Sequence, residues 1–411
     1  MTYTLTTILT SKRAPLMLLA FALVGLLSAC GQKTESTDGE TSSAAVRGVT
    51  DTEIVLGSHT DLSGPLATLG VDGANGARMR FDEVNAAGGI HGRKIRYIVE
   101  DTQYQVPKAI QAANKLIHRD EVFAMAITLG TPTNNAVLTK QIKEGVPNLF
   151  PISGARSMVD PHHRLKFNAR GIYYDEMRAA TNYFVSEQSA EAICVIYQDT
   201  EYGEEILEAA RDQAKAMGKE IVATSSHKPT ESEFTAAIIK LREAGCDLVL
   251  MGTVVRDTIL VLEAARKLDW KDATWVGNNA AYNQVVANQE SGAGEGYYAF
   301  VHLAMMYRDN PPTEAAAAWW DRFIEQHGRP PEYMAMESYR NANLIVEALQ
   351  RAGRDLTVDS MIAALESIEE HTDIFGYKLS FGPNKHQGVS ESTLAQVRDG
   401  RWHTLETSIS Y

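Results

Sequence analysis

From residue 54 onward, short apolar runs alternate with longer amphipathic stretches, and this alternation restricts the fold more than any other feature of the sequence. Runs with the length of buried strands occur at 54–57, 95–99, 122–128 and 146–150. Helical spacing of apolar residues occurs between them, at 71–86, 107–118 and 133–144. Strands that alternate with helices predict a parallel sheet with helices on both faces, and such a sheet binds ligands at the carboxyl ends of its strands.

The same pattern starts again downstream and predicts a second α/β unit. Its strands are expected at 192–197, 220–225, 248–252 and 274–277, and its helices at 204–217, 232–244 and 256–268. A chain of 411 residues is too long for one hydrophobic core and fits two domains. Three further helices, at 313–327, 335–352 and 358–367, precede short strands between 376 and 405. These pieces hold too little core for a third domain, so we expect them to complete the first two.

The first 30 residues are typical of an export signal. Lys12 and Arg13 form a short positive region, and residues 14–27 are almost wholly apolar yet shorter than the roughly 20 residues that span a bilayer. The sequence Leu-Ser-Ala-Cys that ends at Cys30 resembles a bacterial lipobox. We therefore predict a lipoprotein signal peptide at 1–29, lipidation of Cys30, and a periplasmic or otherwise extracytoplasmic protein. The alternative is an uncleaved anchor helix with an incidental cysteine.

Residues 30–50 are polar and rich in serine, threonine and glycine, so we expect the lipidated cysteine to be followed by a flexible tether. The formal net charge is −13, and lysine and arginine are scattered singly, which argues against nucleic-acid partners. Beyond Cys30 the chain contains only Cys194 and Cys246, each in or beside an apolar run. That setting favours two buried small residues, and because an exported protein is able to oxidise such a pair, the sequence leaves open whether the two cysteines are bonded.

The sequence contains no motif for a metal, a cofactor or catalysis. Neither a phosphate loop, a Gly-x-Ser-x-Gly elbow nor a His-Glu-x-x-His pair occurs. The glycines at 70, 73 and 76 do not follow a strand in the dinucleotide pattern and indicate close helix packing. We therefore expect a protein that is not an enzyme and that uses no cofactor.

Several segments together resemble the type I periplasmic solute-binding proteins, which include the leucine/isoleucine/valine receptors of ABC importers. The opening of that family is similar to Leu-Ser-Gly-Pro at 62–65 and Gly-Gly-Ile-His-Gly-Arg-Lys-Ile at 88–95. Further matches follow in register at Glu100-Asp101, 198–203 and 244–249. The resemblance covers about residues 51–405, and the order and spacing of its motifs are more specific than any one of them.

The resemblance implies an α/β fold of two doubly wound lobes joined by three crossover strands. We place the crossovers near residues 172, 302 and 375. The first lobe would then be 51–172 plus 303–374, and the second 173–302 plus 375–411. Ligand contacts from both lobes would favour hinge closure.

The resemblance also implies which residues contact the ligand. In this family the first lobe holds a carboxylate with backbone groups and a hydroxyl in the loop after the third strand, where this chain has Thr131. A hydroxyl and backbone N–H groups at a helix N-terminus suit an anion. Ser153 and Gly154 follow the fourth strand, and Tyr202 of the second lobe would pack over the ligand.

Three positions depart from the amino-acid receptors of the family. Those receptors place a carboxylate for the ligand's ammonium after the strand at 274–277, where this chain has Asn278-Asn279. An asparagine does not offset a buried ammonium as a carboxylate does. Two positions that are often aromatic are Val254 and Leu69. A branched-chain or related amino acid is the first expectation, and a carboxylic acid, aromatic acid or amide without an amine is the alternative.

The nearby Arg156, Arg256 and Tyr282 could alter the pocket. As a function, the resemblance implies a receptor that delivers a small molecule to the permease subunits of an ABC importer. A sensory ligand-binding protein is the second hypothesis, because regulators and receptors use the same fold. A surface-anchored hydrolase is the third, and no nucleophile with its base supports it.

Overall fold

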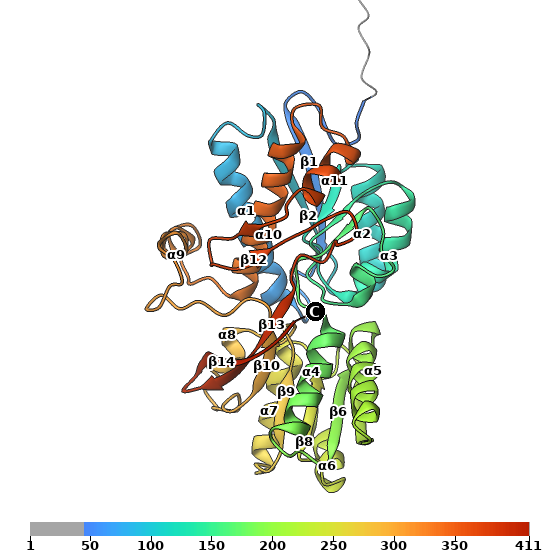
Figure 1. Ribbon diagram of the computed structural model, residues 1–411, viewed down its shortest axis with the longest axis vertical. Coiled ribbons are helices and arrows are strands. Elements are labelled where there is room, and N and C mark those ends of the chain that lie inside the picture. The colour runs from blue at the N-terminus through green and yellow to red at the C-terminus, as the bar shows by residue number, and fades with distance from the viewer. Residues whose placement is uncertain (1–44, 411) are drawn as a thin grey trace, which may run out of the picture. The chain divides into compact units, whose positions relative to one another are not determined.

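The computed structural model describes residues 45–410, and Figure 1 shows their helices and strands. The predicted signal peptide at 1–29 and the predicted lipidation site Cys30 lie outside the described residues. The described strands form a five-stranded sheet, a seven-stranded sheet and a small hairpin. We call the part built on the five-stranded sheet lobe 1 and the part built on the seven-stranded sheet lobe 2.

Lobe 1 contains a parallel sheet in the order β2-β1-β3-β4-β5. Its strands are β1 (Glu53–Thr60), β2 (Lys94–Asp101), β3 (Ala124–Ala126), β4 (Asn148–Leu149) and β5 (Lys166–Phe167). Its helices are α1 (Ala67–Ala86), α2 (Val106–His118), α3 (Thr131–Lys143), α9 (Glu314–His327), α10 (Tyr333–Ala352) and α11 (Val358–Glu366). Every residue of β1 after Glu53 is buried, as expected for a parallel strand that is covered on both faces.

Glycines let the elements of lobe 1 approach each other closely. A Cβ atom at Gly76 of α1 would lie 2.1 Å from the carbonyl oxygen of Ala335 in α10. A Cβ atom at Gly70 would lie 1.8 Å from the carbonyl oxygen of Asp61. The close packing expected from the glycine spacing is therefore confirmed, and it brings a helix from the last third of the chain against the first helix.

Lobe 2 contains a mixed sheet in the order β14-β13-β10-β9-β8-β6-β7. Its parallel strands are β6 (Ile193–Gln198), β7 (Ile221–His227), β8 (Leu248–Gly252), β9 (Thr274–Gly277) and β10 (Tyr298–Val301). Antiparallel pairing adds β13 (Glu391–Arg398) and β14 (Arg401–Ser410) beside β10. Its helices are α4 (Tyr173–Ser186), α5 (Glu201–Ala216), α6 (Thr235–Glu243), α7 (Val255–Lys267) and α8 (Gln284–Ala287).

The chain passes between the two sheets three times. The passages lie between β5 and α4, between β10 and α9, and between β12 (Lys378–Leu379) and β13. The hairpin of β11 (His371–Thr372) with β12 precedes the third passage. Strand pairing therefore leaves residues 380–390 outside both large sheets, and the predicted lobe boundary at 375 stays a proposal.

The α/β fold class with two lobes agrees with the sequence prediction, and the differences are local. The strand β10 and the helix α4 were not predicted. The strand predicted at 122–128 is shorter, because only Ala124–Ala126 pair as a strand. The helix predicted at 71–86 begins earlier, at Ala67.

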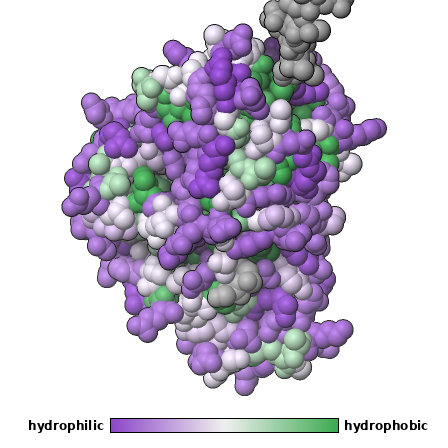
Figure 2. Space-filling model, turned by 45° about the horizontal axis from the view of Figure 1, so that its top comes forward, coloured by the Kyte–Doolittle hydropathy of each residue, from purple (hydrophilic) through white to green (hydrophobic). Residues whose placement is uncertain are grey.

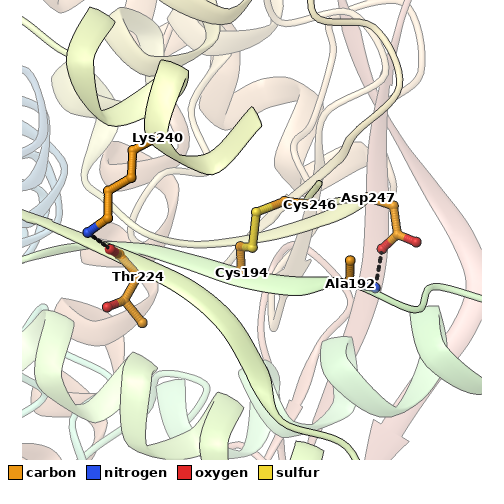
Figure 3. The surroundings of a disulfide bond; sticks show 6 residues. All are labelled: Ala192, Cys194, Thr224, Lys240, Cys246 and Asp247. Atoms are coloured by element: carbon orange, nitrogen blue, oxygen red, sulfur yellow. Dashed lines mark hydrogen bonds between the residues drawn. A yellow bond between two sulfur atoms is a disulfide. The ribbon is translucent and has the colours of Figure 1, made fainter. Parts of the chain in front are cut away.

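The structure answers the question that the sequence left open, because Cys194 and Cys246 form a disulfide. Cys194 lies in β6, and Cys246 lies just before β8, which pairs with β6. Figure 3 shows the bond beside a hydrogen bond from the backbone N–H of Ala192 to Asp247. The sequence did not reveal the bond because the two residues are 52 positions apart and become neighbours only through the pairing of β6 with β8.

The face of the molecule in Figure 2 is mainly hydrophilic, with hydrophobic residues in scattered places. Large apolar side chains that are exposed among the described residues are Val71, Ile110, Val222, Ile239 and Ile324. No helix within residues 45–410 has the length and apolar content that crossing a membrane requires.

Candidate functional site

A small central cavity lies between the two lobes, at the ends of several strands. Its volume is about 20 Å³, which is room for roughly one water molecule, so the lobes enclose the space closely. The side chains and backbone that line it are Leu66, Leu69, Tyr104, Leu129, Gly130, Thr131, Ile152, Arg170, Tyr173, Tyr202, Val254 and Ala280. Most are apolar or aromatic, as is usual for sites that bind small molecules.

The wall from lobe 1 is built around Thr131, the first residue of α3. Gly130 precedes it with a φ of 99°, a conformation that other residues rarely adopt. A Cβ atom at Gly130 would also lie 2.6 Å from both Thr133 Oγ1 and the Tyr104 ring. Glycine is therefore required for the tight turn that leads from β3 into α3.

This lobe 1 wall offers groups that suit an anion. The Thr131 hydroxyl lies 2.8 Å from the Ser153 hydroxyl, and either is able to donate to the other. The first backbone N–H groups of a helix have no partner within that helix, and the helix dipole favours negative charge there. Thr133 donates to the carbonyl oxygen of Leu129 at 2.5 Å, which holds the turn in place from behind.

The wall from lobe 2 contains Tyr202, in the first turn of α5. Its hydroxyl lies 3.1 Å from the carbonyl oxygen of Thr253 and 3.2 Å from Asn278 Oδ1. Its ring meets that of Tyr173 edge to face, with the centroids 5.0 Å apart. Burial raises the pKa of Tyr202 well above its ordinary value, so the hydroxyl stays a neutral donor at physiological pH.

Arg170 is the one charged residue that lines the cavity within the described part of the chain. It is 1% exposed and lies between β5 and the start of α4. Its Nε donates to Asn279 Oδ1 at 2.5 Å, and its Nη2 donates to the Asn279 carbonyl oxygen at 2.8 Å. The Asn279 amide nitrogen in turn donates to Glu176 at 2.7 Å. Asn279 itself does not line the cavity, because Arg170 and Glu176 engage both ends of its side chain.

Glu337 of α10 balances the charge of Arg170. Its Oε2 lies 2.7 Å from Arg170 Nη1 and 3.7 Å from His302 Nε2. Burial opposes ionisation of Glu337, but Arg170 and His302 outweigh it and lower the pKa of Glu337 to about 2. Burial lowers the pKa of His302 to about 4, so the histidine is neutral at pH 7. The pair of Arg170 and Glu337 is therefore fully charged at neutral pH.

Among the described residues, two unused hydrogen-bond donors lie near the cavity, and one unused acceptor, Oε1 of Glu337, lies behind Arg170. Nη2 of Arg170 carries two hydrogens and uses one for Asn279, so one remains for another acceptor. The amide nitrogen of Asn278 is buried and has no partner within residues 45–410, while its Oδ1 accepts from Tyr202 and from the backbone of Ala280. An unused buried donor is costly, so these groups favour a ligand that brings acceptors.

Four of the residues predicted for the site line the cavity, namely Leu69, Thr131, Tyr202 and Val254. Ser153 lies behind Thr131, and the carbonyl oxygen of Gly154 accepts from the backbone of Tyr173 at 2.9 Å. Residues that line the cavity and were not predicted are Leu66, Tyr104, Leu129, Gly130, Ile152, Arg170, Tyr173 and Ala280. Arg170 was not predicted as a site residue, because it is a single arginine beside the predicted crossover near residue 172 and matches no ligand-contact position that the resemblance implies.

Arg156, expected near the pocket, instead joins the two lobes beside the cavity. Its backbone N–H donates to Glu205 of α5 at 3.0 Å, and its guanidinium lies 3.9 Å from the centre of the Tyr174 ring. Burial raises the pKa of Glu205 to about 7. A second bond between the lobes runs from the Tyr104 hydroxyl to Gln198 Oε1 at 3.1 Å.

Two other residues named near the pocket lie elsewhere. Tyr282 is buried beside the second passage, where its hydroxyl accepts from the backbone N–H of Met305 at 2.8 Å. Arg256 lines a neighbouring pocket rather than the central cavity. Within residues 45–410, no cluster of three or more His, Cys, Asp or Glu side chains is arranged to hold a metal ion.

Comparisons with known proteins agree with this architecture. Leu/Ile/Val-binding protein homolog 8 of Brucella abortus is 24% identical over 380 residues, which cover 86% of this chain and 90% of the relative. The fatty acid ABC transporter substrate-binding protein from Thermomonospora curvata is similar with a TM-score of 0.78 at 21% identity, over 89% of this chain and 94% of that one. An ABC transporter solute-binding protein from R. palustris, in complex with benzoate, has a TM-score of 0.76 at 18% identity, over 86% and 95%.

The family itself follows from a match to most of the chain. A sequence model described as periplasmic binding protein matches residues 53–401, which include both lobes and all three passages between them. The similar structures are substrate-binding proteins, and their two-lobed α/β architecture is that of the type I fold. This chain therefore belongs to the periplasmic binding protein family.

Proposed function

We propose that this protein is the substrate-binding component of an ABC importer, held outside the cytoplasm by a lipid on Cys30, and that its ligand is a small carboxylic acid without an ammonium group. Membership of the periplasmic binding protein family supports the role in solute capture. The ABC permease subunits are the proposed partners. The proposed lobes are 51–172 plus 303–374 and 173–302 plus 375–411.

The hydrogen-bond donors around the central cavity are the main support for the proposed ligand class. Arg170 lines the cavity and keeps one N–H for an acceptor, and Asn278 has an unused amide donor nearby. No carboxylate lines the cavity within the described residues. A ligand ammonium would add a buried positive charge beside Arg170 without an anionic partner, which is strongly unfavourable. A carboxylate, in contrast, accepts hydrogen bonds from all of these groups.

Family membership alone leaves the ligand open, because the similar proteins differ in what their names say they bind. One is named for fatty acids, one is in complex with benzoate, and the Brucella relative is named as a homologue of Leu/Ile/Val-binding proteins. The chemistry of Arg170 and Asn279 favours the acids over the branched-chain amino acids that were the first expectation.

The proposed mechanism is closure of the two lobes on the ligand. Thr131 of lobe 1 and Tyr202 of lobe 2 line the same cavity, so a ligand there would contact both lobes at once. A ligand that makes contacts in the closed state that it lacks in the open state shifts the population toward closure. The permease would then recognise the closed form.

Leucine and 4-methylpentanoate test the proposal, because they differ only by the ammonium group. Isothermal titration calorimetry on the purified protein is expected to show binding of 4-methylpentanoate at least tenfold tighter than that of leucine. Their amides, leucinamide and 4-methylpentanamide, serve as controls for the carboxylate. Tighter binding of leucine than of 4-methylpentanoate would refute the proposed ligand class and leave only the binding role.

A transport role and a sensory role differ in what the cell loses. Uptake of the tightest-binding labelled acid is measured in cells with and without the gene for this protein. Loss of uptake supports the importer. Normal uptake, together with loss of a transcriptional response to the acid, would instead favour a sensory ligand-binding protein.

A further inference from the structure

A second pocket lies directly beside the central cavity, and we call it the side pocket. Its volume is about 180 Å³. Its walls come from both lobes and consist of Pro65, Leu66, Thr68, Leu69, Val255, Arg256, Ile259 and Val285. Leu66 and Leu69 line the central cavity as well, so these two side chains form a wall that the two spaces share.

The side chains that line the side pocket are mostly of apolar residues, although polar and apolar atoms share its wall about equally. Six of its eight residues are proline, leucine, valine or isoleucine. The charge of Arg256 is already engaged, because its guanidinium donates to Asp257 Oδ1 at 2.9 Å and to the carbonyl oxygen of Pro229 at 2.6 Å. The side pocket therefore offers apolar side chains next to polar atoms, and its one charged side chain is already paired.

The two spaces differ in size, and each suits a different part of a ligand. An apolar cavity of about 150 Å³ is enough to hold benzene, so the side pocket has room for a phenyl ring or a short alkyl chain. The central cavity, at about 20 Å³, holds little more than one small polar group. The donors described above lie around the central cavity, whereas the larger apolar space lies beyond Leu66 and Leu69.

We propose that the side pocket is a second compartment of the ligand site, which takes an apolar group of phenyl or short alkyl size while the carboxylate lies in the central cavity near Thr131 and Arg170. This inference rests on the proposed function and narrows it to aryl-substituted and medium-chain acids. The proposal requires Leu66 and Leu69 to move aside so that the two spaces connect. Specificity for length would then be set by Ile259 of α7 and Val285 of α8.

A chain-length series measured by calorimetry tests the inference. Affinity is expected to rise about fourfold for each added methylene from butanoate to hexanoate and octanoate, the increase that corresponds to burial of one CH₂ group. The gain should stop once the chain fills the side pocket. The aryl acid 3-phenylpropanoate is expected to bind at least as tightly as hexanoate.

The variants Ile259→Trp in α7 and Val285→Phe in α8 each fill the side pocket from lobe 2. Each is expected to weaken octanoate and 3-phenylpropanoate at least tenfold and to change butanoate less than twofold. The matched control is Ile239→Trp in α6, a residue that is 39% exposed and lines neither space. Using two filling variants keeps the test informative if one of them folds poorly.

The outcomes separate this inference from the proposed function. The proposed role of the side pocket would be overturned if affinity for the acids did not depend on chain length. It would also be overturned if the filling variants reduced the affinities for butanoate and octanoate equally. Neither result would count against the carboxylate site. Failure of every acid to bind, with binding of leucine, would overturn both. A loss of affinity that grows with chain length and occurs only in the two filling variants supports both the side pocket and the carboxylate site.

Discussion

The two walls of the central cavity present hydrogen-bond donors by different means. In lobe 1 the donors belong to Thr131, the adjacent Ser153 and the first turn of α3, all within two loops that follow neighbouring strands. The second wall lies where the first passage joins the lobes, and there Arg170 is held by Asn279 of lobe 2 and by Glu337 of α10 in lobe 1, which is 167 positions away in the sequence. The first wall depends mostly on local backbone geometry, whereas the second depends on distant side chains that must balance one another's charge.

The largest expected effect on stability comes from a substitution in the second wall. In Arg170→Met, Glu337 is left as a buried carboxylate without its partner, so we expect a loss of about 3–5 kcal/mol in the free energy of unfolding. Urea or guanidinium denaturation at pH 7 measures it. The double variant Arg170→Met with Glu337→Gln is expected to recover most of the loss, because no unpaired charge remains. A single variant that costs under about 1 kcal/mol would mean that solvent reaches Glu337 and that the charge balance is unimportant.

The next effect concerns Glu176, which accepts from Asn279 in the same network. Burial raises the pKa of Glu176 to about 7, above its value of about 4.3 in an unfolded chain. Between those pH values the folded protein holds a proton that the unfolded chain has released. The resulting stability is complete below about pH 4.3 and is lost as the pH rises through 7, by up to about 3 kcal/mol.

Unfolding of wild type and Glu176→Gln at pH 5 and pH 8 checks this expectation. The wild type should lose stability between the two values, and the variant should lose less by roughly 2 kcal/mol. Glu205 and Glu332 also have pKa values raised to about 7 by burial, so part of the slope will remain in the variant. Equal slopes in the two proteins would show that Glu176 does not hold a proton at pH 7.

The smallest effect tests the first wall by a matched pair of threonines. Thr131→Val removes a hydroxyl that lines the cavity, and we expect about 10- to 100-fold weaker binding of a carboxylate with little change in stability. Thr133→Val removes the bond to the Leu129 carbonyl oxygen and is expected to cost about 1 kcal/mol of stability with little change in affinity. Calorimetry and denaturation of both variants separate the two roles. If both variants lose affinity alike, the wall acts through the shape of the turn and not through the Thr131 hydroxyl.

The same contrast explains how far the sequence predicts the molecule. Most strands and helices of both lobes follow from local periodicity, with β10 and α4 as exceptions, and Thr131 and Tyr202 followed from the resemblance to the solute-binding family. Arg170 was not predicted, because its role exists only when α10 and the segment after β9 meet it in space. The position of Asn279 was also not predictable from the sequence, because its partners are brought to it only by the fold. Its amide was taken to face the ligand, whereas the structure engages it with Arg170 and Glu176.

The bond between Cys194 and Cys246 has a consequence for how the protein withstands cleavage. It closes residues 194–246 into a covalent ring that contains β7 and α6. The segment 230–233 within this ring is exposed and is a natural place for a protease to cut. A single nick there leaves one covalent molecule in which the two sides of the cut remain joined through sulfur. In the periplasm, where disulfides persist, such a nicked protein keeps both of its lobes connected.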